Sequence, residues 1–310
     1  MKRFLKNNGR FPASLQVVIG ALLISFSSVY VKLADVVPSV SGFYRVFFGG
    51  IFLLLYVVVK KERLWNDTSQ FLTGALAGFV FAVDLYFWHR SIHYIGPGLA
   101  TVIGNFQVFF MAIAGVLFYR ERISFLQAAA IPLAFAGLIP VVGLDWGLLS
   151  TNYKAGLFFG LATALSYAVY ILILRQMQMN RNSLKAAANL VIASFSAAVF
   201  LALIVISEKN TFGIPDTKSL IALICLGVLS QGIGWIFITT GLSGVRAYLA
   251  GILLLLQPSL SFVWDVLFFS RPTMLTGYMG LCVTLVAIYI GSSAKSKGEE
   301  SETIPAEEAQ

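Results

Sequence analysis

Charge is scarce in this sequence: 12% of its 310 residues are charged, whereas 58% are hydrophobic. Soluble domains carry about a quarter charged residues, so the composition excludes one large water-soluble core. Lys and Arg outnumber the acids and give a net charge of +8, but they are scattered between apolar runs and form no basic face. We therefore expect the lipid bilayer, and no nucleic acid, as the partner of this chain.

Cysteine is almost absent, and several reactive motifs are missing altogether. Cys225 and Cys282 both lie inside apolar runs, where a lone thiol behaves as a small hydrophobe, so we expect no disulfide and no metal site. The sequence has no G-x-x-x-x-G-K-[ST] phosphate loop, no G-x-S-x-G and no H-E-x-x-H. These absences argue against direct use of ATP and against common intramembrane hydrolases, so we expect no enzyme and no cofactor.

Long apolar runs, by contrast, recur along the whole chain. About 20 residues of helix are needed to cross roughly 30 Å of hydrocarbon. Ten runs meet that length: 15–34, 39–59, 71–92, 97–118, 124–142, 155–175, 185–206, 219–239, 247–269 and 273–292. The short connections between them predict antiparallel neighbours packed in a bundle.

The distribution of basic residues predicts the orientation of these spans. Lys and Arg favour the cytoplasmic side, and with the N-terminus inside, the outer segments hold only Arg90, Lys154, Lys209, Lys218 and Arg271. We therefore predict a multi-pass protein of the cytoplasmic (inner) membrane with both termini cytoplasmic. Residues 1–14 form a basic cytoplasmic N-terminus before a retained first helix, and residues 293–310 form an acidic, disordered cytoplasmic tail.

A weak internal repeat divides the chain. An offset of 150 pairs Gln107 with Gln257, and an offset of 140 pairs Arg45 with Lys185. Each half has five spans, an odd number, so the second half enters the membrane from the opposite side. The predicted fold class is an all-α polytopic membrane protein whose ten transmembrane helices form two inverted five-helix repeats, 15–143 and 154–292, a design typical of secondary transporters.

The two halves resemble the EamA-type module of the drug/metabolite transporter superfamily. The resemblance rests on Arg45 in FYRVFFGG, on SIHYIGPGLATVI, on Glu121 in LFYRERIS and on AAAIPLAFAGLIPVV. Glu121 has no counterpart in the second half, and Asp84 is unusual for the family, but a subgroup with an Asp before a Trp-His pair (DLYFWH) is similar. The resemblance implies ten helices in two inverted EamA repeats and a small metabolite as the substrate.

Asp84 and Arg45 are the deepest charges in the predicted spans. A charge at mid-membrane is unfavourable by about 2.5–3.5 kcal/mol and normally faces the bundle interior. Arg45 falls roughly 9 Å and Asp84 roughly 12 Å below the outer ends of their helices. Two interpretations stay open: a structural salt bridge between them, or an Asp84 that carries a proton or binds a cationic group of the substrate.

Several polar and aromatic residues lie near the outer ends of the predicted spans. Trp88 shares a helical face with Asp84, and His89 and His93 lie one turn apart. The two histidines have no evident third ligand for a metal, so we expect them at the outer water interface, with Arg90 reaching the headgroups. Lys32 either reaches the interface in the same way or attracts an anionic substrate.

The remaining candidates are Asn105, Gln107, Gln257 and Asp265. The three amides either form interhelical hydrogen bonds or line a cavity beside irregular backbone near Pro97 and Pro258. Asp265 either caps or pairs with Arg271, or belongs to the substrate path. The small-residue pairs GALAG (74–78) and GLFFG (156–160) predict close helix packing and leave a homodimer open.

These features favour a secondary transporter that moves a small polar, amino-acid-like metabolite by alternating access. The absence of a phosphate loop favours proton coupling or exchange, and the resemblance favours export. The alternative is a non-transporting membrane subunit or a lipid scramblase, which predicts no saturable flux of a small solute.

Overall fold

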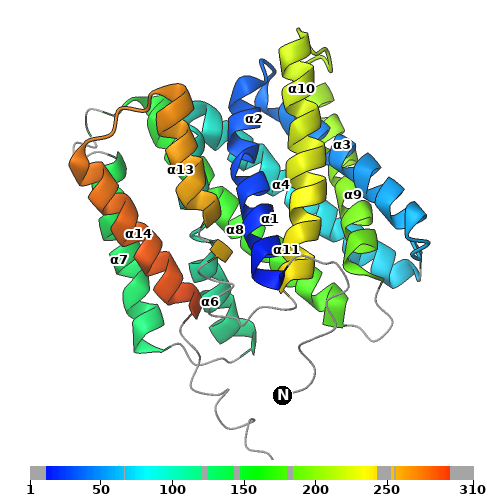
Figure 1. Cartoon of the computed structure of the whole chain (residues 1–310), viewed down its shortest axis with the longest axis horizontal. Helices are drawn as coiled ribbons and strands as arrows, with labels where there is room; N and C mark the ends of the chain where they lie inside the picture. The colour runs from blue at the N-terminus through cyan, green and yellow to red at the C-terminus, as the bar shows by residue number, and fades with distance from the viewer. Residues whose placement is uncertain are drawn as a thin grey trace, which may run out of the picture.

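The protein is a bundle of helices (Figure 1). The computed structural model describes residues 12–65, 67–119, 124–142, 147, 149–179, 184–242, 253–254 and 256–293, and within these ranges every regular element is helical. The helices are α1 Ala13–Ser25, α2 Ser27–Leu33, α3 Pro38–Val59, α4 Thr68–Ile95, α5 Pro97–Gly104, α6 Gln107–Tyr119, α7 Phe125–Val142, α8 Thr151–Met179, α9 Ala186–Ser207, α10 Thr217–Cys225, the π-helix η2 Leu226–Gly234, α11 Trp235–Leu242, α13 Leu256–Phe269 and α14 Leu275–Ser293.

Six stretches of helix are long and apolar enough to cross a bilayer. They are Ala13–Leu33, Pro38–Val59, Thr68–Ile95, Thr151–Leu174, Ala186–Ser207 and Thr217–Ile238. Shorter apolar helices cover Pro97–Met111, Ala128–Val141, Leu256–Phe269 and Leu275–Ile290. The all-α polytopic membrane fold is thereby confirmed, while the count of ten spans stays a prediction. The predicted basic N-terminus and acidic tail lie almost entirely outside the described residues.

Local sequence explains where several helices begin. Asp67 caps α4 by accepting a hydrogen bond from the backbone N–H of Gln70, and Asp216 caps α10 in the same way from Ser219, each at 2.8 Å. Proline occupies the first turn of α3 and α5, where its missing N–H costs no helical hydrogen bond. The capped segments read DTSQFL and DTKSLI, so each half of the chain carries the same start signal.

The packing of the helices follows the same division of the chain. α4 packs against α8 and α9, and η2 with α11 packs against α1 and α3 in the corresponding way. The remaining large contacts join α3 to α9, α5 to α13 and α7 to α14, and Figure 1 shows α7 and α14 side by side at one edge of the bundle. Each half of the chain therefore makes matching contacts with the other half.

Small residues allow the closest of these contacts, as the sequence predicted. A Cβ on Gly78 would lie 2.5 Å from the carbonyl oxygen of Ala193 in α9, and a Cβ on Gly156 would lie 2.7 Å from Cβ of Tyr94 in α4. The core between α4 and α8 also contains a stacked pair of rings, Phe81 and Tyr170, whose centres are 4.5 Å apart. GALAG and GLFFG thus serve helix packing within the chain.

Candidate functional site

A cavity of about 450 Å³ lies inside the bundle and is lined by both halves of the chain. We call it the central cavity. Most of its wall is apolar, as small-molecule sites usually are. Its polar and charged lining residues are Ser27, Arg45, Asp84, Thr101, Asn105, Gln107, Thr163, Tyr167 and Gln257, with Trp88 and Trp235 among the rings. Six predicted site residues therefore meet here: Arg45, Asp84, Trp88, Asn105, Gln107 and Gln257.

The backbone is irregular at three places beside the central cavity. The first span is interrupted at Phe26, between α1 and α2, and the fourth at Asn105 and Phe106, between α5 and α6. The predicted single helix over 97–118 is therefore wrong in this detail. The eighth span contains the π-helix η2. Breaks and π-helical turns are common where a membrane helix lines a functional cavity, so these interruptions mark the cavity as a candidate site.

Arg45 is held between the two halves. It is 6% exposed, and its Nε donates a hydrogen bond of 3.1 Å to Oε1 of Gln231 in η2. Its guanidinium carbon lies 5.0 Å from the ring centre of Trp88, within cation–π range. The approach of η2 depends on glycine, because a Cβ on Gly49 would lie 2.5 Å from Cγ of Gln231.

Asp84 is buried in the same cavity without a partner. It is 4% exposed, and its Oδ1 has no hydrogen-bond partner. Among the described residues, no ion pair within 4.0 Å joins it to Arg45, so the predicted salt bridge is absent from this conformation. The physical reason is that Arg45 is turned to Gln231 and to the ring of Trp88. An acid and a base thus share one cavity without forming a direct ion pair.

The cavity amides are not used to join helices. Asn105 donates from Nδ2 to the carbonyl oxygen of Thr101, one turn earlier in its own segment, at 2.8 Å. This hydrogen bond lies within one segment of the chain, so it does not join two separate spans. Oε1 of Gln107 is buried and has no partner. Of the two interpretations of these side chains, the structure favours the cavity-lining one.

Asp265 lies apart from the central cavity, in a paired cluster that joins α13 to the α4–α5 turn. It is 2% exposed, and its Oδ2 accepts hydrogen bonds from the backbone N–H of Gly98 at 3.0 Å and from Nη1 of Arg271 at 3.2 Å. Nη1 of Arg271 also donates to the carbonyl oxygen of Ile95 at 2.7 Å. The predicted pairing of Asp265 with Arg271 is confirmed, and we call these residues the α13 clamp.

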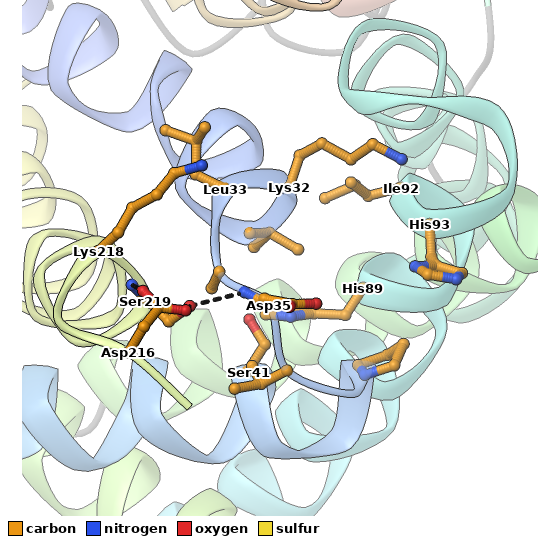
Figure 2. Close-up of a pocket in the computed structure, with 14 residues that line it drawn as sticks. Lys32, Leu33, Asp35, Ser41, His89, Ile92, His93, Asp216, Lys218 and Ser219 are labelled. Atoms are coloured by element: carbon orange, nitrogen blue, oxygen red, sulfur yellow. Dashed lines mark hydrogen bonds between the residues drawn. The ribbon is translucent and has the colours of Figure 1, made fainter. Parts of the chain in front are cut away.

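A second pocket, of about 390 Å³, lies at the end of the bundle that carries α2 and the start of α10. We call it the α2–α10 pocket (Figure 2). It contains Lys32 and His89, and it shares no lining residue with the central cavity. Ser41 lines this pocket and Arg45, one turn further along α3, lines the central cavity, so the two hollows occupy successive levels.

Two predictions for this end of α4 are wrong. His89 was expected at the water interface but is 0% exposed, because the α2–α3 connection and the start of α10 cover it. Arg90 was expected among the headgroups but forms an ion pair with Glu208, the residue that ends α9. Its guanidinium carbon also lies 3.5 Å from the ring centre of Tyr86. His93 is exposed, as predicted.

Several residues that line the cavity or contact its lining were missed by the sequence reasoning. Gln231, which orients Arg45, lies in SQGIG within the eighth apolar run, where a polar amide among glycines was an available signal. Thr163 and Tyr167 are spaced one turn apart on α8, but hydroxyl groups are common in apolar helices and gave no signal. Within the described ranges, no three His, Cys, Asp or Glu side chains gather to hold a metal ion.

Comparisons with known proteins agree with this arrangement. The model of the EamA-like transporter family matches the chain twice, over residues 11–143 and 154–293. A crystal structure of a protein that is 17% identical superimposes with a TM-score of 0.62, over 90% of this chain and 96% of that one. At that identity the likeness shows a shared fold.

Curated relatives are similar over most of their length. An uncharacterized transporter of Archaeoglobus fulgidus is 23% identical and covers 76% of this chain and 81% of its own. Solute carrier family 35 member G1 of Mus musculus is 25% identical, over 86% and 75%. The uncharacterized transporter YvbV of Bacillus subtilis is 24% identical, over 84% of each chain.

The fold and the cavity define the class as a multi-pass, all-helical membrane transporter with a hollow between two similar halves. Since the family model covers nearly the whole helical part of the chain, the protein belongs to the EamA-like transporter family. It is a membrane transporter, and its partners are a small-molecule substrate and the lipid bilayer.

Proposed function

We propose that the central cavity is the substrate site of a secondary transporter for a small polar metabolite of the amino-acid kind. The protein works by alternating access across the cytoplasmic membrane, with both termini in the cytoplasm. The single observation that carries the proposal is the pair of buried, unlike charges that face one cavity without pairing with each other. Arg45 and Asp84 are 6% and 4% exposed, and both line the central cavity.

The two charges offer complementary sites for one ligand. The guanidinium of Arg45 suits a carboxylate, because its planar donors match two carboxylate oxygens. The free Oδ1 of Asp84 suits an ammonium group. Burial makes both interactions worth more than they would be in water, and it makes an empty site unfavourable. A ligand with both groups would satisfy both side chains at once.

The repeat and the broken helices support alternating access. Inverted repeats place substrate sites at their interface, where discontinuous helices meet. In this chain the helix break at Phe26 and the break at Asn105 and Phe106 flank the central cavity. The matching contacts of the two five-helix halves favour rocking of one half against the other as the movement that changes access.

Asp84 also supports coupling to protons or exchange of one solute for another. It is the only acid among the described residues that line the central cavity. A carboxyl group that gains and loses a proton there would change the charge of the site during the cycle. We propose export as the direction, on the strength of the family resemblance alone.

Flux into proteoliposomes tests the proposal. Purified protein is reconstituted and uptake of labelled neutral amino acids is measured with and without an inward pH gradient. We expect saturable uptake of at least one of them that depends on the pH gradient. In Asp84→Asn we expect the rate of uptake to fall about tenfold or more. Asp67→Asn is the matched control, because the same substitution there keeps a helix cap and faces no cavity.

The outcomes separate the alternatives. No saturable flux of any amino acid, together with dye-labelled lipid exchange between leaflets, would support the scramblase alternative. No flux of either kind would support a non-transporting subunit. Flux that is equal in Asp84→Asn and wild type would remove Asp84 from the substrate and proton path.

A further inference from the structure

The α2–α10 pocket has the features of a second ligand site. Its walls come from five places in the chain: the end of α2, the α2–α3 connection, the first turns of α3, the last turns of α4 and the start of α10. Figure 2 shows His89 extending from α4 toward the centre of the pocket, with Lys32 and Lys218 at its margin. The pocket is separate from the central cavity and holds about 390 Å³, enough for a small metabolite.

Two buried polar groups in the pocket have no partner in the protein. His89 is 0% exposed, and neither Nδ1 nor Nε2 has a hydrogen-bond partner. Ser41 is 1% exposed, and its Oγ is likewise unpartnered. A buried polar group without a hydrogen bond is unfavourable by about 1–3 kcal/mol. Two such groups in one hollow are therefore best explained by a ligand that bonds to them.

The charges around the rim are of both signs, and no two of these described residues form an ion pair within 4.0 Å, although Lys218 lies close enough to Asp216 to act on it electrostatically. Lys32, Asp35 and Lys218 are exposed, line the pocket and take part in no ion pair within 4.0 Å among the described residues. Asp216, the second acid, is already occupied, because Ser219 donates to it from its backbone N–H and its hydroxyl. The backbone N–H of Asp35 donates to Oγ of Ser219 at 2.9 Å, which holds the rim together.

These contacts select the charge of the ligand. A simple anion would meet Lys32 and Lys218 but would also face the free carboxylate of Asp35. A simple cation would face two ammonium groups. A zwitterion can place its acid group near the lysines and its ammonium near Asp35, and its oxygens can accept a hydrogen bond from the imidazole of His89 or the hydroxyl of Ser41.

We propose that the α2–α10 pocket is a second binding site, distinct from the central cavity, for a small zwitterion that carries an acidic oxygen group and an ammonium group. The site goes beyond the proposed function, because it shares no lining residue with the central cavity. Free amino acids and the phosphoethanolamine headgroup of lipids share this chemistry, and the probes below distinguish them.

Equilibrium binding to the purified full-length protein tests the site. The probes are glycine, β-alanine and γ-aminobutyrate, in which the two charges are increasingly far apart, with propionate and propylamine as single-charge controls and glycerophosphoethanolamine as the headgroup probe. We expect at least one zwitterion to bind saturably and both single-charge controls to bind at least about tenfold more weakly. Binding of the headgroup probe in place of the amino acids would assign the pocket to lipid.

Variants locate the binding. Asp35→Asn and Lys218→Gln change exposed rim residues, so we expect them to fold normally and to weaken the zwitterion about tenfold or more. Ser41→Ala removes a buried group without a partner, so the melting temperature of the ligand-free protein should hold or rise while binding weakens. Lys60→Gln, at an exposed lysine outside the pocket, is the matched control and should bind as wild type.

A comparison with the central cavity keeps failure of this proposal separate from failure of the proposed function. In Asp84→Asn, binding that depends on Asp35 and Lys218 should persist. Binding that is lost in Asp84→Asn but unchanged in Asp35→Asn and Lys218→Gln would place all zwitterion binding in the central cavity and overturn the second site. Absence of zwitterion binding to any of these proteins at millimolar concentration would also overturn it.

Discussion

Two buried aspartates of this protein differ in their hydrogen-bond partners. Asp265, in the α13 clamp, is 2% exposed and is bonded to Arg271 and to the backbone of Gly98. Asp84, in the central cavity, is 4% exposed, and its Oδ1 has no partner although Arg45 lines the same cavity. Burial is nearly equal, so the difference lies in the hydrogen bonds.

The comparison separates structural charge from functional charge. An acid whose partners are provided by the fold has its charge compensated in the folded state, and removing a partner leaves an unfavourable buried charge. An acid without a partner destabilises the ligand-free protein. Its burial becomes favourable only when a bound ligand forms a hydrogen bond or an ion pair with it. Sequence position alone did not distinguish the two, because both are single aspartates within apolar runs.

The largest expected effect comes from breaking the α13 clamp. Arg271→Ala leaves Asp265 buried without its counter-charge, which should lower the free energy of unfolding by about 3–5 kcal/mol. The apparent melting temperature of the purified protein should fall by roughly 10 °C. Asp265→Asn in the same background removes the unpaired charge and should recover much of the loss.

The control for this prediction is an ion pair whose cation is exposed. Lys185 pairs with Glu62 at 3.1 Å, and its side chain is 73% exposed, against 12% for Arg271, whereas Glu62 is 10% exposed. Water can reach the lysine side of this pair, so Lys185→Ala should lower stability less than Arg271→Ala does. Equal losses in Lys185→Ala and Arg271→Ala would show that the clamp stabilises the fold no more than the Lys185–Glu62 pair does.

Asp84→Asn should change the stability in the opposite direction from Arg271→Ala. The substitution removes a buried charge that has no ion-pair partner among the described residues, so the melting temperature should hold or rise by the equivalent of about 1–3 kcal/mol while transport is lost. Thermal unfolding of Asp84→Asn beside Asp265→Asn measures the contrast directly. A drop for Asp84→Asn as large as that for Asp265→Asn would mean that Asp84 is structural.

The general plan of the fold was accessible from the sequence. The length and spacing of the apolar runs predicted the spans, because the thickness of the bilayer sets the length of helix needed to cross it. Six of the ten runs are confirmed as helices long enough to cross it. Six of the predicted site residues also line the central cavity. Burial of Arg45, Asp84 and Gln107 in an apolar chain is unfavourable unless they face a cavity, so their presence in spans was informative.

Contacts between distant segments could not be predicted in the same way. The partner of Arg45 is set by how closely η2 approaches α3, which depends on glycines whose neighbours only the fold reveals. His89 was misplaced for a related reason: its depth along α4 put it near the outer end, but the α2–α3 connection and the start of α10 cover that end. Covering segments of this kind have no periodic signal.

A smaller effect is expected when the hydrogen bond that turns Arg45 away from Asp84 is removed. Gln231→Leu deletes the acceptor of Nε, so Arg45 should be free to pair with Asp84, and the substrate concentration for half-maximal flux should rise about tenfold. Asp84→Asn combined with Gln231→Leu should show no further loss beyond Asp84→Asn alone. Additive losses would mean that Gln231 acts on the substrate independently of Asp84.

The smallest expected effect belongs to an acid outside the membrane spans. The backbone N–H of Ser219 donates to Asp216 and, with its hydroxyl, holds the pKa of this exposed carboxyl below its ordinary range. Because the folded-state pKa is lowered, the charged cap stabilises α10 at neutral pH, and this contribution is lost as the pH falls through the lowered pKa.

Asp216→Asn keeps an acceptor at the cap, so the melting temperature should drop only slightly at neutral pH. Thermal unfolding at a series of acidic pH values should show the gap between wild type and Asp216→Asn closing as the carboxyl of the wild type becomes protonated. A gap that stays constant with pH would show that the charge of Asp216 contributes nothing, leaving the cap to its geometry alone.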